Sequence, residues 1–515
     1  MARAVRASRA PGSPKPPQAS NPSTPPAGVG PSRFLLGRAA DLGLVAGAPA
    51  WILPLVYGLG ALVSDQTVNN WVMALGAIGH HLPGMLRAYG DRALFRRFRA
   101  RFVAVPPLLV IACVWSSVSG FHGVALVAFL WGVWHGLMQT YGFARIFASK
   151  EGQGDRGTAR LDFALLATWF AAAVILSPLR MPFIFNVGAS CGMPLPPAAV
   201  MRGIEWAAIA ATAAATIAWL IGAGVSWARG RAPGPRRVLL ITGSIAFWWF
   251  ANVRVSHPLL GLPLFELFHD VQYLAIVWAF NRRRVGMDRA GAELAPWLRA
   301  LFSPSATALV IYALLCGGYG ALSFLQSPEL SGRVIAGLVT ASQLLHFYYD
   351  GFIWRVREPQ TGAALGVQAA ASVPVISSGG MRHALAFAPI AIVAAALSVG
   401  EVARPVPSEA RIEAIADLVP RSAIAQTGLG ELLWSRGDRR GAVTRLARAV
   451  ALDPDYAPAR RNLALSLVEM ADDAERASDQ KVYSRLMQEI ERLRPSLDGD
   501  AADLVDDRLK RSGAR

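Results

Sequence analysis

Five histidines lie within apolar stretches of the chain that are each long enough to cross a membrane. They are His80, His81, His135, His269 and His346, out of eight histidines in the whole sequence. An ionisable side chain inside a bilayer costs free energy, so each of these positions is a candidate functional site.

The separation between each histidine and the arginine that ends its stretch is similar in all four stretches. It is 7 residues from His80 to Arg87, 10 from His135 to Arg145, 13 from His269 to Arg282 and 9 from His346 to Arg355. At a rise of about 1.5 Å per helical residue, these separations correspond to about 10 to 20 Å. We therefore predict that the histidines occupy one slab of the bilayer, in the half closer to those arginines.

A polar residue follows three of the histidines one helical turn later. The pairs are His135 with Gln139, His269 with Tyr273, and His346 with Asp350. Residues four apart share a helix face, and metal-bound imidazoles usually have such a neighbour, which orients the ring. Asp350 and Glu266 are carboxylates that could also bind an ion directly. Neutral imidazoles with a carboxylate in a dry site suit iron, zinc or copper.

The sequence therefore predicts a metal centre but assigns no individual catalytic residue. The predicted ligands are His80, His81, His135, His269, His346, Asp350 and Glu266; the predicted orienting residues are Gln139, Gln272, Tyr273 and Gln343. Arg87 and Arg145 are predicted to contact a lipid phosphate or carboxylate. Iron is the first candidate ion, zinc and copper are alternatives, and haem held between two facing histidines is less favoured. No nucleotide or flavin fingerprint is visible.

The residues above lie on some of eleven apolar segments of about 20 residues, the length that a helix needs to cross the hydrocarbon layer. We place them at 42–64, 69–89, 103–119, 122–146, 161–178, 203–226, 237–253, 259–281, 306–325, 332–354 and 382–400. The segments do not alternate as barrel strands do, so the predicted fold is an all-α polytopic membrane bundle.

Basic residues concentrate in alternate loops between these segments. Arginines and lysines fill the loops around 91–101, 150–160, 229–237, 282–289 and 355–382, whereas 64–70, 119–123 and 326–333 hold few or none. Because cations favour the cytoplasmic side, we predict a cytoplasmic N-terminus and, after eleven crossings, an outer or periplasmic C-terminus in a bacterial membrane. Arginines and lysines in the cytoplasmic loops account for the net charge of +17, so no nucleic-acid partner is predicted.

Four regions follow from the composition. Residues 1–33 are a basic, Pro-rich arm predicted to be disordered, 34–402 the membrane domain, 403–420 a linker and 421–515 a soluble helical domain. The last region carries Leu429, Gly430, Leu433, Gly437, Ala442, Leu446, Ala449 and Pro454, followed by Leu463 and Ala464. This spacing resembles the 34-residue tetratricopeptide repeat, which implies a helical stack that binds a protein partner.

The histidine cluster on several membrane segments loosely resembles the membrane non-haem iron enzymes, namely the fatty-acid desaturases and hydroxylases and the carotene dioxygenases of bacteria. The only adjacent pair, His80 and His81, has no third histidine at the spacing of a desaturase box. The resemblance implies oxygen-dependent oxidation or cleavage of a hydrophobic substrate by iron, without a residue-by-residue match.

We therefore predict a membrane-embedded, metal-dependent enzyme that acts on a lipid or isoprenoid and docks a protein through its tail. One alternative is a proton-coupled transporter, favoured by the helix break at Pro83 and Gly84. Another is a scaffold or assembly protein that works through the tail. The last is that the histidines only form hydrogen bonds between packed helices.

Overall fold

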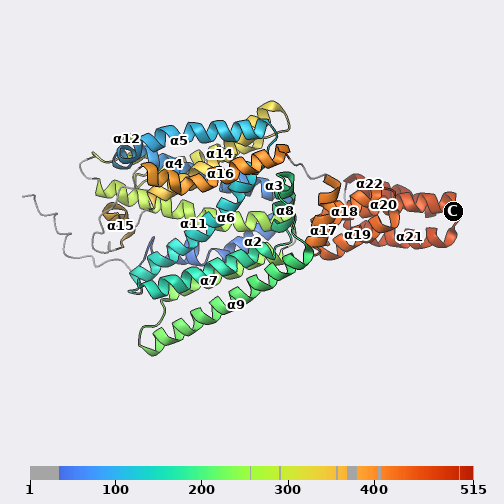
Figure 1. The fold of residues 1–515 in the computed structure, drawn as a ribbon, viewed down its shortest axis with the longest axis horizontal. Helices are drawn as coiled ribbons and strands as arrows, with labels where there is room; N and C mark the ends of the chain where they lie inside the picture. Colours follow the sequence, from blue (N-terminus) through green and yellow to red (C-terminus); the bar gives the residue numbers. More distant parts are fainter. Residues whose placement is uncertain are drawn as a thin grey trace, which may run out of the picture.

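The structure is a computed structural model that describes residues 34–255, 257–288, 291–354, 358–367, 380–403, 408–497 and 499–513. Over these residues the chain is helical and forms no β-strand (Figure 1). The predicted arm, residues 1–33, lies outside the described residues.

The membrane part is a bundle of helices in three successive groups. The first group is α1 (Arg38–Ala40), the π-helical stretch η1 (Asp41–Ala46), α2 (Pro49–Gly60), α3 (Asp65–Trp71), the π-helical stretch η2 (Val72–Ile78) and α4 (His81–Gly90). The second is α5 (Arg92–Val118), α6 (Gly123–Lys150), α7 (Arg156–Ile175), α8 (Arg180–Ser190), α9 (Ala198–Ala228), α10 (Pro235–Trp249) and η3 (Phe250–Arg254). The third is α11 (Pro258–Met287), α12 (Pro296–Leu301), α13 (Ala306–Ala321), η4 (Leu322–Leu325), α14 (Leu330–Ile353), α15 (Pro359–Leu365) and α16 (Gly380–Ala403).

Six helices are long and apolar enough to cross a membrane, namely α5, α6, α7, α9, α11 and α13 together with η4. The run from α1 to α2, bent by 57°, is a seventh candidate. The other predicted segments are also helical. Some are broken, as in α3, η2 and α4, α14 is polar, and α10 and the described apolar part of α16, Phe387–Ala403, are shorter than 18 residues. The polar residues of the predicted site, such as His346 and Asp350, are one reason why α14 does not qualify on composition.

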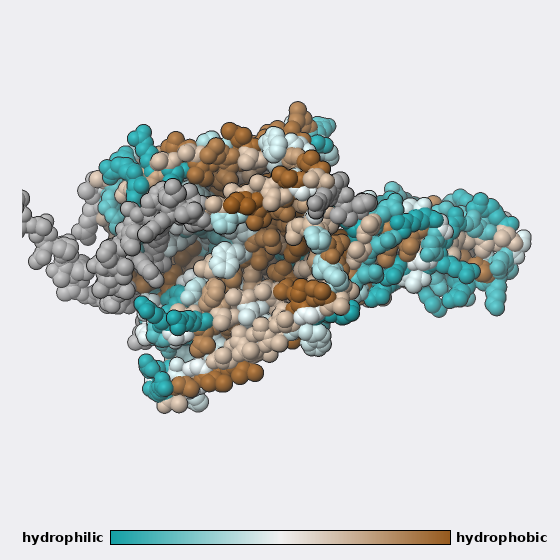
Figure 2. Space-filling model, in the orientation of Figure 1, coloured by the Kyte–Doolittle hydropathy of each residue, from teal (hydrophilic) through white to brown (hydrophobic). Residues whose placement is uncertain are grey.

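The outer surface of the bundle is apolar. Large side chains such as Leu314, Trp206 and Ile111 are 70%, 70% and 66% exposed. Figure 2 shows apolar residues over much of the visible face of the bundle and hydrophilic residues over the tail. So much exposed apolar surface would be unfavourable in water, which indicates an integral membrane protein.

Helix α14 is held in the middle of the bundle by a close crossing with α5. A Cβ atom added at Gly337 of α14 would lie 2.5 Å from Val114 Cα and 2.9 Å from Cys113 O of α5. Glycine therefore allows the two backbones to approach. This crossing fixes the helix that carries His346 and Asp350.

The tail extends from one end of the bundle, opposite α12 and α15 (Figure 1). It consists of α17 (Ser408–Leu418), α18 (Ala423–Ser435), α19 (Arg439–Leu452), α20 (Ala457–Arg476), α21 (Gln480–Leu493), η5 (Arg494–Ser496) and α22 (Gly499–Gly513). Helix α17 lies within the predicted linker. Leu418 of α17 packs against Met181 and Met201 of the bundle.

We predict that Gly337→Val destabilises the protein by about 1 to 3 kcal/mol, because the added methyl groups overpack the crossing of α14 with α5. Thermal unfolding of the detergent-solubilised protein measures the effect. Gly351→Val is the matched control on the same helix, since a Cβ atom there has no neighbour within 4 Å. Equal unfolding temperatures for the two variants would contradict the proposed role of Gly337.

Candidate metal centre

The five histidines predicted to lie at one depth meet in one cluster. His80 and His81 lie where η2 gives way to α4, His135 lies on α6, His269 on α11 and His346 on α14. The ring centroids are 4.7 Å apart for His80 and His346, 4.8 Å for His135 and His346, and 5.0 Å for His135 and His269. Four segments that are distant in sequence therefore bring imidazoles to one place.

Two overlapping groups of side chains within this cluster could hold a metal ion. One consists of His80, His269 and His346, and the other of His135, His346 and Asp350. In each group the candidate ligand atoms lie within 4.8 Å of one another. Two ligand atoms that each lie about 2.0 to 2.2 Å from one ion are less than 4.8 Å apart. A small side-chain movement would therefore complete either site. His346 belongs to both groups.

His80 is oriented for such a role by Asp270. The Nδ1 atom of His80 lies 2.8 Å from Asp270 Oδ1 and 3.2 Å from the carbonyl oxygen of Gly76. The other ring nitrogen, Nε2, is buried and has no hydrogen-bond partner. A carboxylate on one ring nitrogen and an unpaired second nitrogen is the arrangement of a metal-binding imidazole. The close approach of Asp270 requires glycine at position 76, where a Cβ atom would lie 2.6 Å from Asp270 Oδ2.

Asp270 is a residue that the sequence analysis missed. It directly follows His269, so on a helix it points about 100° away from that ring and was not paired with it. The structure shows that it contacts a histidine on another helix. Its side chain is almost fully buried, with 1% exposure. A carboxylate next to a buried histidine was the signal available in the sequence.

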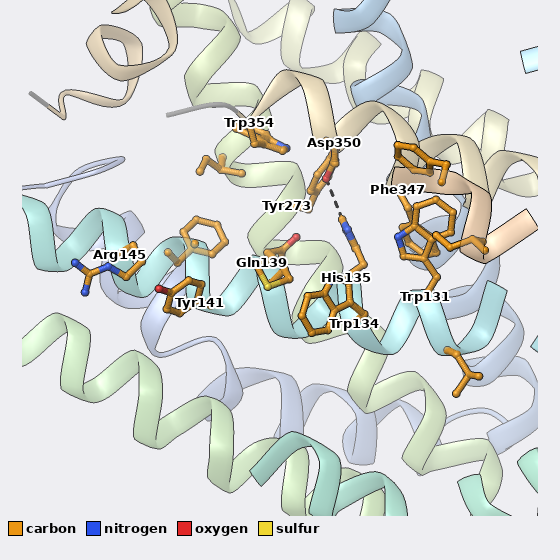
Figure 3. Close-up of a pocket in the computed structure, with 18 of the residues that line it drawn as sticks. Trp131, Trp134, His135, Gln139, Tyr141, Arg145, Tyr273, Phe347, Asp350 and Trp354 are labelled. Carbon is orange, nitrogen blue, oxygen red and sulfur yellow. Dashed lines mark hydrogen bonds and ion pairs between the residues drawn. The ribbon is translucent and has the colours of Figure 1, made fainter. Parts of the chain in front are cut away.

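Asp350 links the cluster to Tyr273. The Tyr273 hydroxyl donates a hydrogen bond of 2.8 Å to Asp350 Oδ1, and Asp350 Oδ2 lies 3.7 Å from His135 Nε2 (Figure 3). Tyr273 was predicted to orient His269, one turn before it, but its hydroxyl binds Asp350 instead. A Cβ atom at Gly84 would lie 2.7 Å from this hydroxyl, so glycine is needed there too.

Gln139 and Gln272 donate hydrogen bonds to backbone carbonyls, and Gln139 also donates to Gln272, rather than to imidazole nitrogens. Gln139 donates to the carbonyl oxygen of His269 at 3.0 Å and to Gln272 Oε1 at 3.3 Å. Gln272 donates to the carbonyl oxygen of Val45 at 2.7 Å. These bonds tie α6, α11 and η1 together around the cluster. Gln343 faces Gly132 of α6, where an added Cβ atom would lie 3.5 Å from Gln343 Nε2.

Two predicted ligands belong to neither candidate group. His81 stacks on His346 with 5.0 Å between ring centroids, and its Nδ1 atom is 3.0 Å from Ser342 Oγ. Ser342 in turn lies 2.7 Å from the Tyr319 hydroxyl. Glu266 lies on α11, one turn before Asp270, outside both groups. His81 therefore lies beside the candidate ligands and contacts Ser342, which in turn contacts Tyr319.

The two predicted anion contacts differ in their surroundings. Arg87 is buried, with its guanidinium carbon 3.8 Å from the ring centroid of Phe280 and 5.1 Å from that of Trp354. It therefore lies in the protein interior and not against lipid headgroups. Arg145 lines a cavity and its side chain is 20% exposed.

This cavity has a volume of about 1290 Å³ and reaches the candidate metal centre. His135 and Asp350 form part of its wall, and most other lining residues are aromatic or aliphatic side chains of α6, α11, α14 and α16. Leu130 and Trp134 of the same wall are 45% and 50% exposed on the surface of the bundle. An apolar molecule could therefore reach the histidines from the lipid.

The fold and the cluster together define a helical membrane protein with buried histidine groups that could bind a metal ion. No family model, curated protein or solved structure matches the chain.

We predict that Asp270→Asn weakens metal binding about 10- to 100-fold, because His80 loses the carboxylate that orients its ring. Competition against a calibrated chelator measures the affinity. Asp417→Asn, an exposed position in α17, is the matched control and is expected to bind metal like the wild type. An unchanged affinity in the Asp270 variant would show that His80 needs no such partner or is not a ligand.

Proposed function

We propose that this chain is a membrane-embedded, metal-dependent enzyme that acts on a lipid or isoprenoid substrate, with iron as the first candidate ion. The observation that carries the proposal is that two groups of ligand atoms share His346, and that His135 and Asp350 of one group border an apolar cavity. The unpaired, buried nitrogens His80 Nε2 and His346 Nδ1 support it, since a buried polar atom without a partner costs free energy.

The residues would divide the work as follows. Either His80, His269 and His346 or His135, His346 and Asp350 would hold the ion. Asp270 would keep His80 in the correct orientation. Iron would supply oxidation chemistry, whereas zinc would activate water for hydrolysis. Tyr273 would keep Asp350 in place and could exchange a proton with it. The aromatic cavity wall would exclude water from the reacting carbon. A redox reaction would require electrons from a separate donor protein.

We also propose the eleven-span topology, with the N-terminus in the cytoplasm and the tail on the outer side. Support comes from α12, which follows the arginine-rich end of α11 and lies with α15 at the end of the bundle opposite the tail (Figure 1). The tail would then be a tetratricopeptide-like domain that binds a protein. Its helical hairpins support this, as does the close packing of Gly430 on Leu446, where an added Cβ atom would lie 2.7 Å from Leu446 Cγ.

A proton-coupled transporter is the second candidate. The observation that favours it is the break between η2 and α4 beside His80 and His81, because transporters often bind their solute at broken helices. A buried chain of ionisable groups, such as His80 with Asp270, could also carry protons. The two functions differ in their need for a metal ion.

We predict that the purified wild type contains stoichiometric iron, zinc or copper and that the His135→Ala, His346→Ala double variant retains less than about a tenth of it, because both ligand groups lose a member. Elemental analysis with a visible spectrum makes the measurement and also detects haem. His122→Ala, whose side chain is 62% exposed at a distance from the cluster, is the control. A freshly purified wild type without metal would contradict the proposed metal-dependent enzyme and favour the proton-coupled transporter.

A second prediction concerns the tail. Deleting residues 421–515 keeps α17 on the bundle and should leave the metal content of the membrane part unchanged, because both ligand groups lie in the bundle, on α6, α11, α14 and the junction of η2 with α4. Elemental analysis of the shortened protein tests this. Loss of both the metal and the fold on deletion would instead indicate that the tail is needed to assemble the bundle.

A further inference from the structure

The cavity beside the candidate metal centre is apolar along most of its length but has a cationic end. It follows α6, from Trp131 past His135 to Arg145 (Figure 3). Among the described residues that line it, Arg145 is the one arginine or lysine. A molecule lying in this cavity would therefore place one end against a guanidinium group and its middle against His135.

The positive charge of Arg145 is not fully neutralised. Its Nη1 atom lies 3.5 Å from Asp162 Oδ2, is buried, and makes no hydrogen bond. Asp162 is already engaged by Arg237, whose Nε lies 3.0 Å away, and accepts a hydrogen bond of 2.9 Å from Trp219. Two arginines thus share one carboxylate, which leaves one excess positive charge. Asp162 is fully buried, so this charge is weakly screened.

The two acidic residues of the cavity do not cancel this charge. Asp350 belongs to the candidate metal centre, where its Oδ2 atom lies 3.7 Å from His135 Nε2. Glu358 Oε1 is paired with Arg97 Nη1 at 2.9 Å. The cationic end therefore keeps a net charge of about one unit. A ligand with a single negative charge at one end is the electrostatic match.

We propose that the cavity binds a long-chain monocarboxylate, with its carboxylate on Arg145 and its hydrocarbon chain running along α6 past His135. This inference deepens the proposed function, since it rests on the metal centre facing the same cavity. A carboxylate carries one negative charge and fits a guanidinium fork, whereas a phosphate monoester carries about −1.5 to −2 at neutral pH. Apolar side chains along α6, α14 and α16 would contact the chain.

The geometry also determines which carbon would face the candidate metal centre. His135 and Arg145 are ten residues apart on one continuous helix, or about 15 Å at 1.5 Å per residue. An extended hydrocarbon chain with bonds of about 1.5 Å and bond angles of about 111° advances by about 1.25 Å per carbon. The carbon beside His135 would therefore be roughly the twelfth from the carboxylate.

Equilibrium binding of radiolabelled hexadecanoate, hexadecyl phosphate and hexadecanol to the full-length protein in lipid nanodiscs tests the inference. We expect hexadecanoate to bind most tightly and Arg145→Gln to weaken its binding by roughly tenfold or more, because a charge-assisted hydrogen bond is lost. Arg160→Gln removes the same charge from an exposed position nearby and should change nothing. Equal binding of hexadecanol, preference for the phosphate, or no effect of Arg145→Gln would each overturn it.

Photo-crosslinking tests the placement of the chain and does not depend on how well the Arg145 variant folds. A fatty acid with a diazirine at about carbon 12 should label peptides around His135 and Asp350, and one with a diazirine beside the carboxylate should label the end of α6 near Arg145. The reverse pattern would overturn the inference. Metal content, measured on the same samples, reports separately on the proposed function. Specific hexadecanoate binding by a protein without metal would contradict the metal-dependent enzyme but not the carboxylate-binding cavity.

Discussion

Polar groups buried inside an apolar helical bundle are the constraint on which the rest of this structure depends. Five imidazoles and the carboxylates of Asp270 and Asp350 lie in or beside one cluster, and a buried polar atom without a partner costs free energy. Hydrogen bonds from Tyr273 to Asp350 and between His81 and Ser342 satisfy part of the set. His80 Nε2 and His346 Nδ1 have no hydrogen-bond partner, so they are available to a metal ion that the group could hold.

The arrangement of the helices follows from bringing these groups together. Gly76 and Gly84 leave room for Asp270 and for the Tyr273 hydroxyl, and Gly337 lets α14 approach α5 closely. The π-helical stretch η2 ends where His80 and His81 begin, as π-helical turns often do at functional sites. The cavity along α6 joins this polar cluster to the apolar surface, so the same bundle could provide both the chemistry and the access route for a hydrophobic substrate.

Sequence reasoning predicted the all-α membrane fold and one common depth for the histidines, because hydropathy and helical rise are properties of single segments. Whether the histidines meet depends on how the segments pack, which the spacing does not give. Sequence reasoning also did not predict side-chain partners between segments. Asp270 was overlooked because its partner, His80, lies on another helix, and Tyr273 was paired with His269 although it binds Asp350. Neither the cavity nor the sharing of Asp162 by Arg145 and Arg237 could be read from spacing, since both depend on how separate helices pack.

X-ray absorption spectroscopy at the edge of the bound metal tests whether the buried histidines hold an ion, because it reports the ligand atoms around that ion in solution. We expect two or three imidazole nitrogens at about 2.0 to 2.2 Å, with a carboxylate oxygen at a similar distance where the ion lies in the group that contains Asp350. The ring-carbon scattering of imidazole identifies the histidines. A spectrum without imidazole scattering, or a protein that binds no iron, zinc or copper, would contradict the proposed metal centre.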